Sequence, residues 1–436
     1  MKSATEYPGV SSEIGSPVFQ FSRMENLLRG HSVRTVAVDG VSAEFVTDPV
    51  LVRRILVKDS KNYGKGELFR KARNLSRAGL LTEDESVHRH YRRLTHPYLR
   101  TAAVAEYAQV MHEIAREAVT SWRLGQAVDV QAEMCRISSA VALRTLFHGV
   151  PREASALLGE HLAALSWEMM RKPLYGKAAT RAERQLSSRR LSRTRADFRG
   201  LLASCMADLL HSPDCTEGYL SALLTDSGKH GTPVLTPDEV CDEAVMMLTA
   251  ATVTTASVMS WALYVISQDP LIEEKVLKDM AQTGGESVPL GNGHGPVGYT
   301  VRFLMEVLRL YPPVWITCRR TLSDVTLGDY SFARGTQVLF SSYLLHRNPD
   351  RYPDPYRFDP DRWLSIRPTT DDASYIPFGI GAKGCVGESF AWKELEILLG
   401  AVIQEWQLMV EPGSRVRKAA ETTLHPRRLL MVPQPR

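Results

Sequence analysis

The sequence predicts one helix-dominated fold with a minor β part, contained in a single domain over residues 1–436. Helical apolar periodicity runs through about 85–311 and 387–406. Short alternating segments with Gly and Pro turn signals fall within about 30–60, 316–342 and 407–436, which we assign to the β-rich part. The sequence contains neither an internal repeat nor an interdomain linker that would divide the chain.

The individual elements follow from local patterns. Apolar and polar residues alternate around Val33, Val36 and Phe45, which is typical of half-buried strands. The Pro pair after Tyr311 ends the helix that precedes it, because proline cannot continue a helix. In chain order we expect strands from residue 30, a helix over 48–58, mostly helices over 85–285, a loop over 283–299, a helix over 299–311, strands within 316–342, a loop over 347–384, a helix over 387–406 and closing strands.

One segment is apolar enough to imitate a membrane span. Residues 244–268 contain no charged side chain, and roughly 20 apolar residues suffice to cross a bilayer. Seven of these positions are Thr or Ser, whereas a helix that faces lipid would be richer in Leu and Ile. We therefore interpret the segment as a long helix buried through the middle of a large protein, and we expect no membrane span.

The composition excludes several classes of protein. Hydrophobic residues make up 44% and charged residues 23%, which excludes a disordered chain, a collagen-like chain and a small disulfide scaffold. The 53 basic and 49 acidic residues give a net charge of +4, too balanced to indicate a nucleic-acid partner. The six cysteines show no zinc-site spacing, and the N-terminus shows no apolar signal segment, so we expect reduced thiols in a cytoplasmic chain.

A glycine motif in the second half of the chain matches a dinucleotide fingerprint. Gly293, Gly295 and Gly298 have the GxGxxG spacing, which binds a pyrophosphate only between a strand and a helix. Here the motif follows a polar segment without a β pattern. We interpret it as a loop and expect no nicotinamide cofactor.

The most informative segment surrounds one cysteine just before a predicted helix: Phe378-Gly379-Ile380-Gly381-Ala382-Lys383-Gly384-Cys385-Val386-Gly387. A thiol at a helix N-terminus meets free backbone N–H groups and the positive end of the helix dipole, which stabilise its thiolate. The glycines allow a flat ligand to approach the backbone closely. The alternative is a packing cysteine in a glycine loop, and the FxxGxxxCxG spacing argues against it.

This segment resembles the haem-ligand loop of the cytochrome P450 family. The resemblance implies that Cys385 is the thiolate ligand of the iron in haem b and that Phe378 shields the sulfur from water. Lys383 stands where the family usually has His or Arg on a haem propionate. Lysine can supply the charge but not the planar donor geometry.

The family's second signature, ExxR, occurs five times in this chain. Only Glu306 and Arg309 lie on an apolar helix that ends in Tyr-Pro-Pro, about 75 residues before the cysteine loop as in the family. Arg362, in Phe358-Asp359-Pro360-Asp361-Arg362-Trp363, is similar to the family's third partner. The resemblance implies a buried network with a structural role. The other four pairs are expected to be surface ion pairs: Glu67/Arg70, Glu113/Arg116, Glu133/Arg136 and Glu168/Arg171.

Three further positions resemble the family's propionate-binding residues. His88 and Arg92 are four residues apart on one face of a predicted helix, so both can reach one propionate. A solvated basic face is the alternative. Arg319 matches the third position, with Arg320 as a close competitor.

The charge-free helix is similar to the family's distal helix at Ala250-Ala251-Thr252-Val253-Thr254-Thr255. Thr254 falls where the oxygen-contacting threonine is expected, and Val253 replaces the usual acid, which delivers protons. Either Thr252, Thr254 or a substrate hydroxyl organises the water that carries protons, or the reaction needs less proton delivery, and we predict the first of these two cases. A Thr-rich stretch taken alone is more often part of a core helix.

The resemblance spans nearly the whole chain and implies a haem-thiolate monooxygenase that uses O2 and electrons from a separate ferredoxin and ferredoxin reductase. We expect a monomer that hydroxylates or epoxidises an apolar small molecule, for example a terpenoid or polyketide. The alternatives are oxidative coupling, desaturation or another non-hydroxylating reaction, favoured by Val253, or a haem-binding sensor without turnover. Lys383, Lys393 and the Arg-rich segment near residue 90 are either a docking surface for an acidic ferredoxin or ordinary solvated charges. The pocket candidates are Met247, Ala250, Ala251, Thr254, Val314, Trp315, Ile316, Thr422, Thr423 and Leu424.

Overall fold

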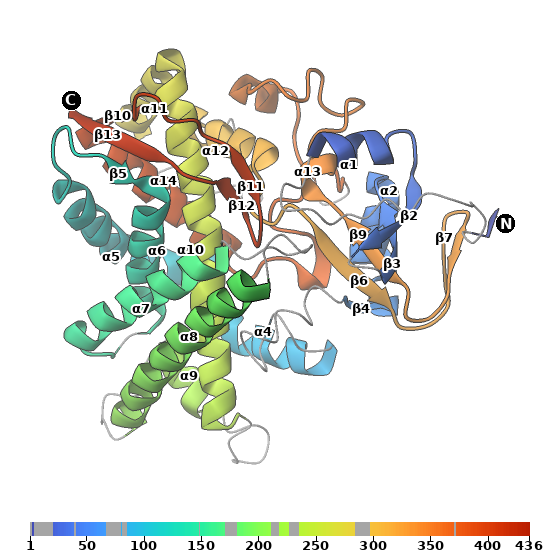
Figure 1. Cartoon of the computed structure of the whole chain (residues 1–436), viewed down its shortest axis with the longest axis horizontal. Helices are drawn as coiled ribbons and strands as arrows, with labels where there is room; N and C mark the ends of the chain where they lie inside the picture. The colour runs from blue at the N-terminus through green and yellow to red at the C-terminus, as the bar shows by residue number, and fades with distance from the viewer. Residues whose placement is uncertain are drawn as a thin grey trace.

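A computed structural model of the chain places a large helical part beside a smaller sheet-rich part (Figure 1). The structure describes residues 2–3, 21–38, 41–66, 80, 85–147, 149–170, 181–210, 218–225, 235–283, 297–369 and 372–436. Most of the Gly/Pro loop predicted at 283–299, including Gly293 and Gly295, lies outside the described residues. The predicted helix-dominated fold with a minor β part is confirmed.

The helical part begins at α4, and the described helices before it are short. The helices are α1 (Phe21–Leu28), α2 (Pro49–Arg53, continued by a π-helical turn over Arg54–Lys58), α4 (Glu85–Leu99), α5 (Thr101–Thr120), α6 (Val130–Leu146), α7 (Arg152–Met170), α8 (Arg181–Leu210), α9 (Tyr219–Thr225), α10 (Pro237–Gln268), α11 (Pro270–Thr283), α12 (Tyr299–Leu310), α13 (Ser342–Leu345) and α14 (Glu388–Glu405). Short 3₁₀ turns cover Ser60–Asn62, Pro360–Leu364 and Gly381–Lys383.

The largest sheet has the strand order β2-β3-β9-β6-β4, in which β3 and β9 run parallel and the other neighbours antiparallel. Its strands are β2 (Val33–Val38), β3 (Val41–Val46), β4 (Tyr63–Lys65), β6 (Thr317–Thr321) and β9 (Gln337–Phe340). The other strands are β1 (Lys2–Ser3), β5 (Val128–Asp129), β7 (Val325–Leu327), β8 (Tyr330–Phe332), β10 (Trp406–Val410), β11 (Lys418–Ala420), β12 (Leu424–Pro426) and β13 (Leu430–Pro435). Among the described strands, only β5, which pairs with β13, lies wholly inside a stretch predicted as helical, and β10 overlaps one by a single residue.

Helix α10 forms the axis of the helical part (Figure 1). It begins at a capping box, in which the Thr236 hydroxyl accepts from the Glu239 N–H and the Glu239 carboxylate accepts from the Thr236 N–H. Among the described helices it alone is long and apolar enough to cross a membrane. However, 83% of its most apolar 18-residue window is buried inside the protein. The interpretation of 244–268 as a buried core helix agrees with this packing.

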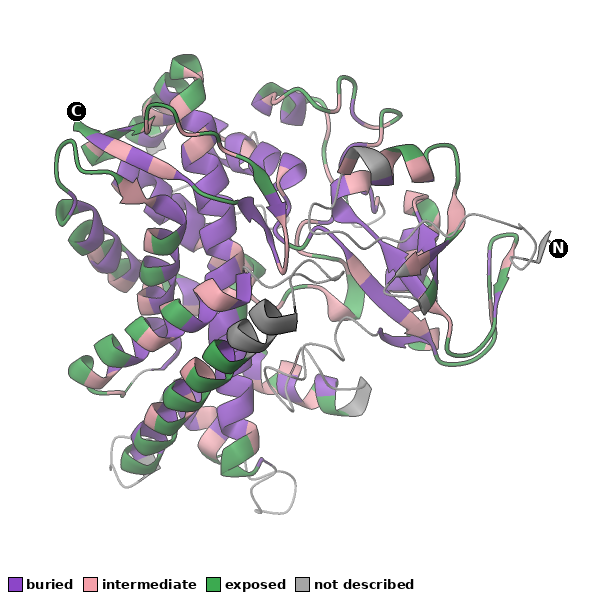
Figure 2. Ribbon diagram, viewed as in Figure 1, coloured by how far each residue is buried: buried purple, intermediate pink, exposed green. Residues whose placement is uncertain are grey.

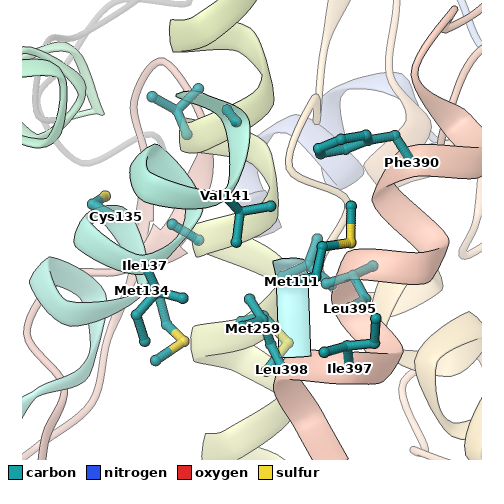
Figure 3. Packing of buried hydrophobic residues seen from close by; sticks show 14 of the residues in the cluster. Met111, Met134, Cys135, Ile137, Val141, Met259, Phe390, Leu395, Ile397 and Leu398 are labelled. Atoms are coloured by element: carbon teal, nitrogen blue, oxygen red, sulfur yellow. The ribbon is translucent and has the colours of Figure 1, made fainter. Parts of the chain in front are cut away.

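The main apolar core lies where α5, α6, α10 and α14 meet. Figure 3 shows side chains from these helices gathered in one region, including Met111, Ile137, Met259 and Leu395, which belong to the same buried cluster. All four side chains are buried. This core fixes α10 against α14, the helix that follows Cys385.

Candidate functional site

The cysteine loop is closed by a backbone hydrogen bond. The Cys385 N–H donates to the Phe378 carbonyl at 2.8 Å, which holds the two ends of the segment together directly before α14. Gly379 and Gly381 have φ angles of +69° and +75°, which side chains disfavour. A Cβ atom on Gly381 would also lie 2.4 Å from the Leu56 carbonyl oxygen. The loop therefore requires glycine where it passes the turn after α2.

The Cys385 thiol is exposed at the surface of the described protein. Desolvation by the surrounding protein nevertheless raises the pKa of the thiol to about 11. A hydrogen bond from the Gly387 N–H acts in the opposite direction and lowers this pKa, because it favours the thiolate. The thiol is therefore protonated at neutral pH, and a bound metal ion would deprotonate it. The other described cysteines, at 135, 205, 241 and 318, are buried.

Cationic side chains surround this loop on two sides. Arg92 of α4 donates from Nη1 to the Gly384 carbonyl at 2.7 Å, and Lys383 donates from Nζ to the Tyr63 carbonyl at 2.9 Å. His88 is buried one turn before Arg92 on α4, and Arg319 is buried on β6. Desolvation lowers the pKa of Arg319 to about 10, so an anionic group placed beside it would be stabilised. Arg320 is less buried than Arg319, which favours Arg319 over its competitor.

The structure brings Glu306, Arg309 and Arg362 into one buried cluster. Arg309 donates from Nε and Nη2 to the two Glu306 oxygens, both at 2.8 Å, and Arg362 donates from Nε to Glu306 at 2.9 Å. The Trp363 indole and the Asp359 N–H also donate to Glu306, at 3.1 and 2.9 Å. The carboxylate thus accepts five hydrogen bonds. By contrast, Glu133 and Arg136 form a partly exposed pair.

The cluster is connected to the segment that leads into the cysteine loop. His346 donates from Nδ1 to the Arg309 carbonyl at 3.3 Å, and its Nε2 accepts from the Ile376 N–H at 2.8 Å. Desolvation lowers the pKa of His346 to about 3, so it is neutral at physiological pH. The Tyr375 hydroxyl donates to the Met305 carbonyl at 3.1 Å. Sequence reasoning missed Trp363, His346 and Tyr375, and only Trp363 had a signal, its place beside Arg362.

The central part of helix α10 is accessible at a single place. Between residues 240 and 263 every residue is buried except Ala250, Ala251 and Thr254. These three small residues share one face because they are one turn apart. The Thr254 hydroxyl donates to the Ala250 carbonyl at 2.9 Å, so only its lone pairs are left for other groups. We call this accessible surface the α10 notch.

Thr252 does not lie at the notch. Its side chain is fully buried, donates to the Leu248 carbonyl at 2.9 Å and lies 3.4 Å from the Ser139 hydroxyl of α6. This position argues against the predicted catalytic role of Thr252 and indicates that it packs between α6 and α10. Val253 is also buried, in the main core.

The predicted pocket residues after α12 and near the terminal turn differ in exposure. Val314 is exposed, whereas the Trp315 indole is buried and donates to the Glu421 carbonyl at 3.0 Å. Thr423 is buried 2.9 Å from the Ser257 hydroxyl of α10, and the Trp261 indole donates to the Leu424 carbonyl at 3.1 Å. The β11–β12 turn is therefore fixed to α10. Met247 and Ile316 are buried, and Thr422 is half-buried.

The residues present fit a thiolate-ligated haem. The iron and two propionates would require an accessible thiol, a glycine loop held against the protein and cations such as Arg92, Lys383 and Arg319. Phe378 is half-buried and its ring lies 5.9 Å from that of Trp392. The structure places it at the loop end opposite Cys385.

Comparison with known proteins gives consistent matches. The family model described as cytochrome P450 matches residues 20–436. Cyclooctatin synthase and cyclooctat-9-en-7-ol 5-monooxygenase, both from Streptomyces melanosporofaciens, are each 30% identical over 89% of this chain and 85% of their own. Pentalenene oxygenase from Streptomyces avermitilis is 28% identical over 90% of this chain and 88% of its own.

Solved structures share the fold. Retinoic acid bound cyanobacterial CYP120A1 has a TM-score of 0.79 at 20% identity and covers 95% of this chain and 94% of its own. CYP175A1 from Thermus thermophilus has a TM-score of 0.72 at 26% identity, with the same coverage.

Proposed function

Because the chain belongs to the cytochrome P450 family and is an oxidoreductase of that family, we propose that it is a haem-thiolate monooxygenase that hydroxylates or epoxidises an apolar secondary metabolite. The family uses a haem cofactor, O2 and a redox partner, and the form of haem proposed here is haem b. The observation that carries the proposal is the exposed Cys385 thiol on its glycine loop, together with the accessible α10 notch on a helix whose other central residues are buried.

A terpenoid is the proposed substrate, with a polyketide as the second class. Two relatives at 30% identity are named for cyclooctatin and for cyclooctat-9-en-7-ol, and a third for pentalenene. The notch supports an apolar substrate, because two of its three residues are alanines and the third has its only hydroxyl proton bonded to the backbone.

Each residue near the thiol has a proposed task. Cys385 ligates the iron, and the bound haem supplies the activation of dioxygen. Arg92, Arg319, His88 and Lys383 hold the propionates. For Arg92 and Lys383, this means that they share their donors between the propionates and the backbone carbonyls they contact here. Phe378 excludes water from the sulfur.

Proton handling is proposed to fall to Thr254. Val253 can neither donate nor accept a proton through its side chain. The Thr254 hydroxyl accepts from water through its lone pairs while it donates to Ala250, and it can release that carbonyl to donate in turn. Val253 also supports a second candidate, a P450 reaction without oxygen insertion, such as oxidative coupling or desaturation.

Electrons are proposed to come from a ferredoxin and its reductase in the cytoplasm, to a monomeric enzyme. Arg89, Arg93 and Arg100 on and after α4 are exposed, on the helix that contacts the cysteine loop through Arg92. With Lys393 of α14 they form a basic surface suited to an acidic partner.

The test is ligation. The ferrous CO complex of the purified protein should show the red-shifted Soret band of thiolate ligation, and Cys385→Ser should abolish it. Cys318→Ser, which changes a buried thiol of β6, should keep the band. Retention of the band in Cys385→Ser would refute the proposal.

Titration with apolar natural products should then displace the water on ferric haem and shift its spectrum, which identifies the substrate class. Turnover with a ferredoxin system, analysed for oxygen in the product, separates hydroxylation from coupling or desaturation.

A further inference from the structure

Helix α8 contains most of the protein's excess positive charge. Residues 181–199 include seven arginines and two acids, a net charge of +5. The whole chain has 53 basic and 49 acidic residues, so the other 417 residues hold 46 basic against 47 acidic and have a net charge of −1. All seven cations are arginine and none is lysine.

The described part of α8 is amphipathic. Leu191, Phe198 and Leu202 are buried against the protein, whereas Arg189, Arg190 and Arg193 are exposed. The three arginines lie within one turn on one face, since their spacing is three and four residues. Figure 2 shows the outer side of α8 as exposed along most of its length. We call these three residues the α8 patch.

The patch is rigidly connected to the helix of the proposed active site. Arg199, further along α8, forms ion pairs with Asp238 and Asp242 of α10. Asp242 is buried, so this connection is not a loose surface contact. A surface that binds α8 is thereby held at a fixed position relative to the helix that contains the α10 notch.

We propose that the α8 patch docks the protein on the surface of an anionic phospholipid membrane. The planar guanidinium group forms paired hydrogen bonds to phosphate oxygens, which distinguishes it from lysine and suits phosphodiester headgroups. The apolar face of α8 is buried in the protein core and cannot insert into lipid. The contact between the α8 patch and the membrane is therefore electrostatic and peripheral. An apolar substrate partitions into the membrane, and docking there brings the enzyme to its source. The docking itself does not depend on the proposed function.

The experiment uses co-sedimentation of the haem-loaded full chain with vesicles. Vesicles of phosphatidylcholine with phosphatidylglycerol should bind the protein at low salt, pure phosphatidylcholine should not, and high salt should release it because screening shortens the range of the interaction. Arg189→Gln/Arg190→Gln/Arg193→Gln should weaken binding roughly a hundredfold, since each arginine near an anionic surface contributes about fivefold. Glutamine has a helix propensity close to that of arginine, so the substitutions should leave α8 intact.

The matched control removes the same charge from another helix. Arg89→Gln/Arg93→Gln/Arg100→Gln also replaces three exposed arginines, on and after α4, and should keep most of the vesicle binding. Equal loss in both variants would show a non-specific charge effect and overturn the proposal, as would failure of the unchanged protein to bind anionic vesicles. Tighter binding to an oligonucleotide or an acidic protein than to vesicles would assign the patch to that partner instead. None of these outcomes depends on the P450 reaction, which the CO spectrum tests separately.

Discussion

Replacing Glu306 by Ala tests the buried cluster. The change removes the acceptor of five hydrogen bonds and leaves Arg309, which is 0% exposed, without a counter-ion. Arg309 would keep its hydrogen bonds to the carbonyls of His346, Pro355 and Arg357. Arg362 would keep its hydrogen bonds to the carbonyls of Pro353 and Arg357, but neither guanidinium group would have a negative charge beside it. Breaking one buried ion pair costs about 3–5 kcal/mol.

The expected loss is therefore large relative to total stability. Glu306 serves two guanidinium groups, the Trp363 indole and one backbone N–H, and a buried donor left unsatisfied costs about 1–3 kcal/mol. We expect a loss of roughly 5 kcal/mol or more, of the same order as the 5–15 kcal/mol that stabilises a typical protein. Glu306→Gln keeps the shape and one acceptor, so it should be destabilised less.

The assay combines urea unfolding of the apoprotein with the haem content of the expressed protein. Glu113→Ala is the control, because Glu113 also begins an ExxR sequence but pairs with Arg144 at 3.2 Å with a 40% exposed side chain. An exposed pair contributes about 0–1 kcal/mol. Glu306→Ala should shift the unfolding midpoint strongly and leave little haem-loaded protein, whereas Glu113→Ala should leave both near normal. Similar midpoints for the two variants would refute the reasoning.

Three further changes have defined outcomes. Gly381→Ala should destabilise the apoprotein more than Gly335→Ala, because both positions have positive φ but only Gly381 places a Cβ against a carbonyl; equal unfolding midpoints would contradict the clash. Thr254→Ala should lower product formed per NADPH consumed and raise peroxide release, and Val253→Asp should not fully restore coupling in that background; an unchanged ratio would exclude Thr254 from proton delivery. Glu394 of α14 is buried, and desolvation raises its pKa from 4.5 to about 8 against a hydrogen bond from the Thr255 hydroxyl. The pKa of Glu394 is higher in the folded protein than in the unfolded chain, so its contribution to the free energy of unfolding is fully present below pH 4.5. That contribution is lost, by about 1.4 kcal/mol per pH unit, as the pH rises from 4.5 towards 8. Glu394→Gln should flatten the fall of the urea midpoint between pH 5 and 8, and equal slopes in both proteins would contradict the assignment.

Most of the helices and strands could be predicted because they have a local signal, such as the 3.6-residue apolar period or the Pro pair after Tyr311. The Glu306–Arg309 pair could not be chosen from five ExxR sequences by spacing alone. Its apolar helix and its likeness to a known family distinguished it. His346 could not be found at all, because its partners, Arg309 and Ile376, are at least 30 residues away in sequence and are joined to it by backbone atoms.

Helix geometry separates Thr252 from Thr254, which the sequence analysis had grouped together. Successive residues are about 100° apart around a helix axis, so Thr252 and Thr254 point about 200° apart and cannot both face one surface. The sequence placed both near the expected oxygen site, and the structure separates them between the α6 contact and the notch. The exposure of Cys385 and the raised pKa of its thiol are likewise properties of the assembled fold.

The α10 notch also bears on how this enzyme can diversify. Most of α10 is constrained by packing, and substitution there would disturb the core, whereas Ala250 is exposed and Ala251 is half-buried. Selection for new substrates should therefore collect changes at 250 and 251, where a larger side chain reshapes the α10 notch without unfolding the protein. Mutational libraries confined to these two codons should retain folded protein at a far higher rate than libraries at 244–249, so one helix combines a constrained scaffold with an adaptable patch two residues wide.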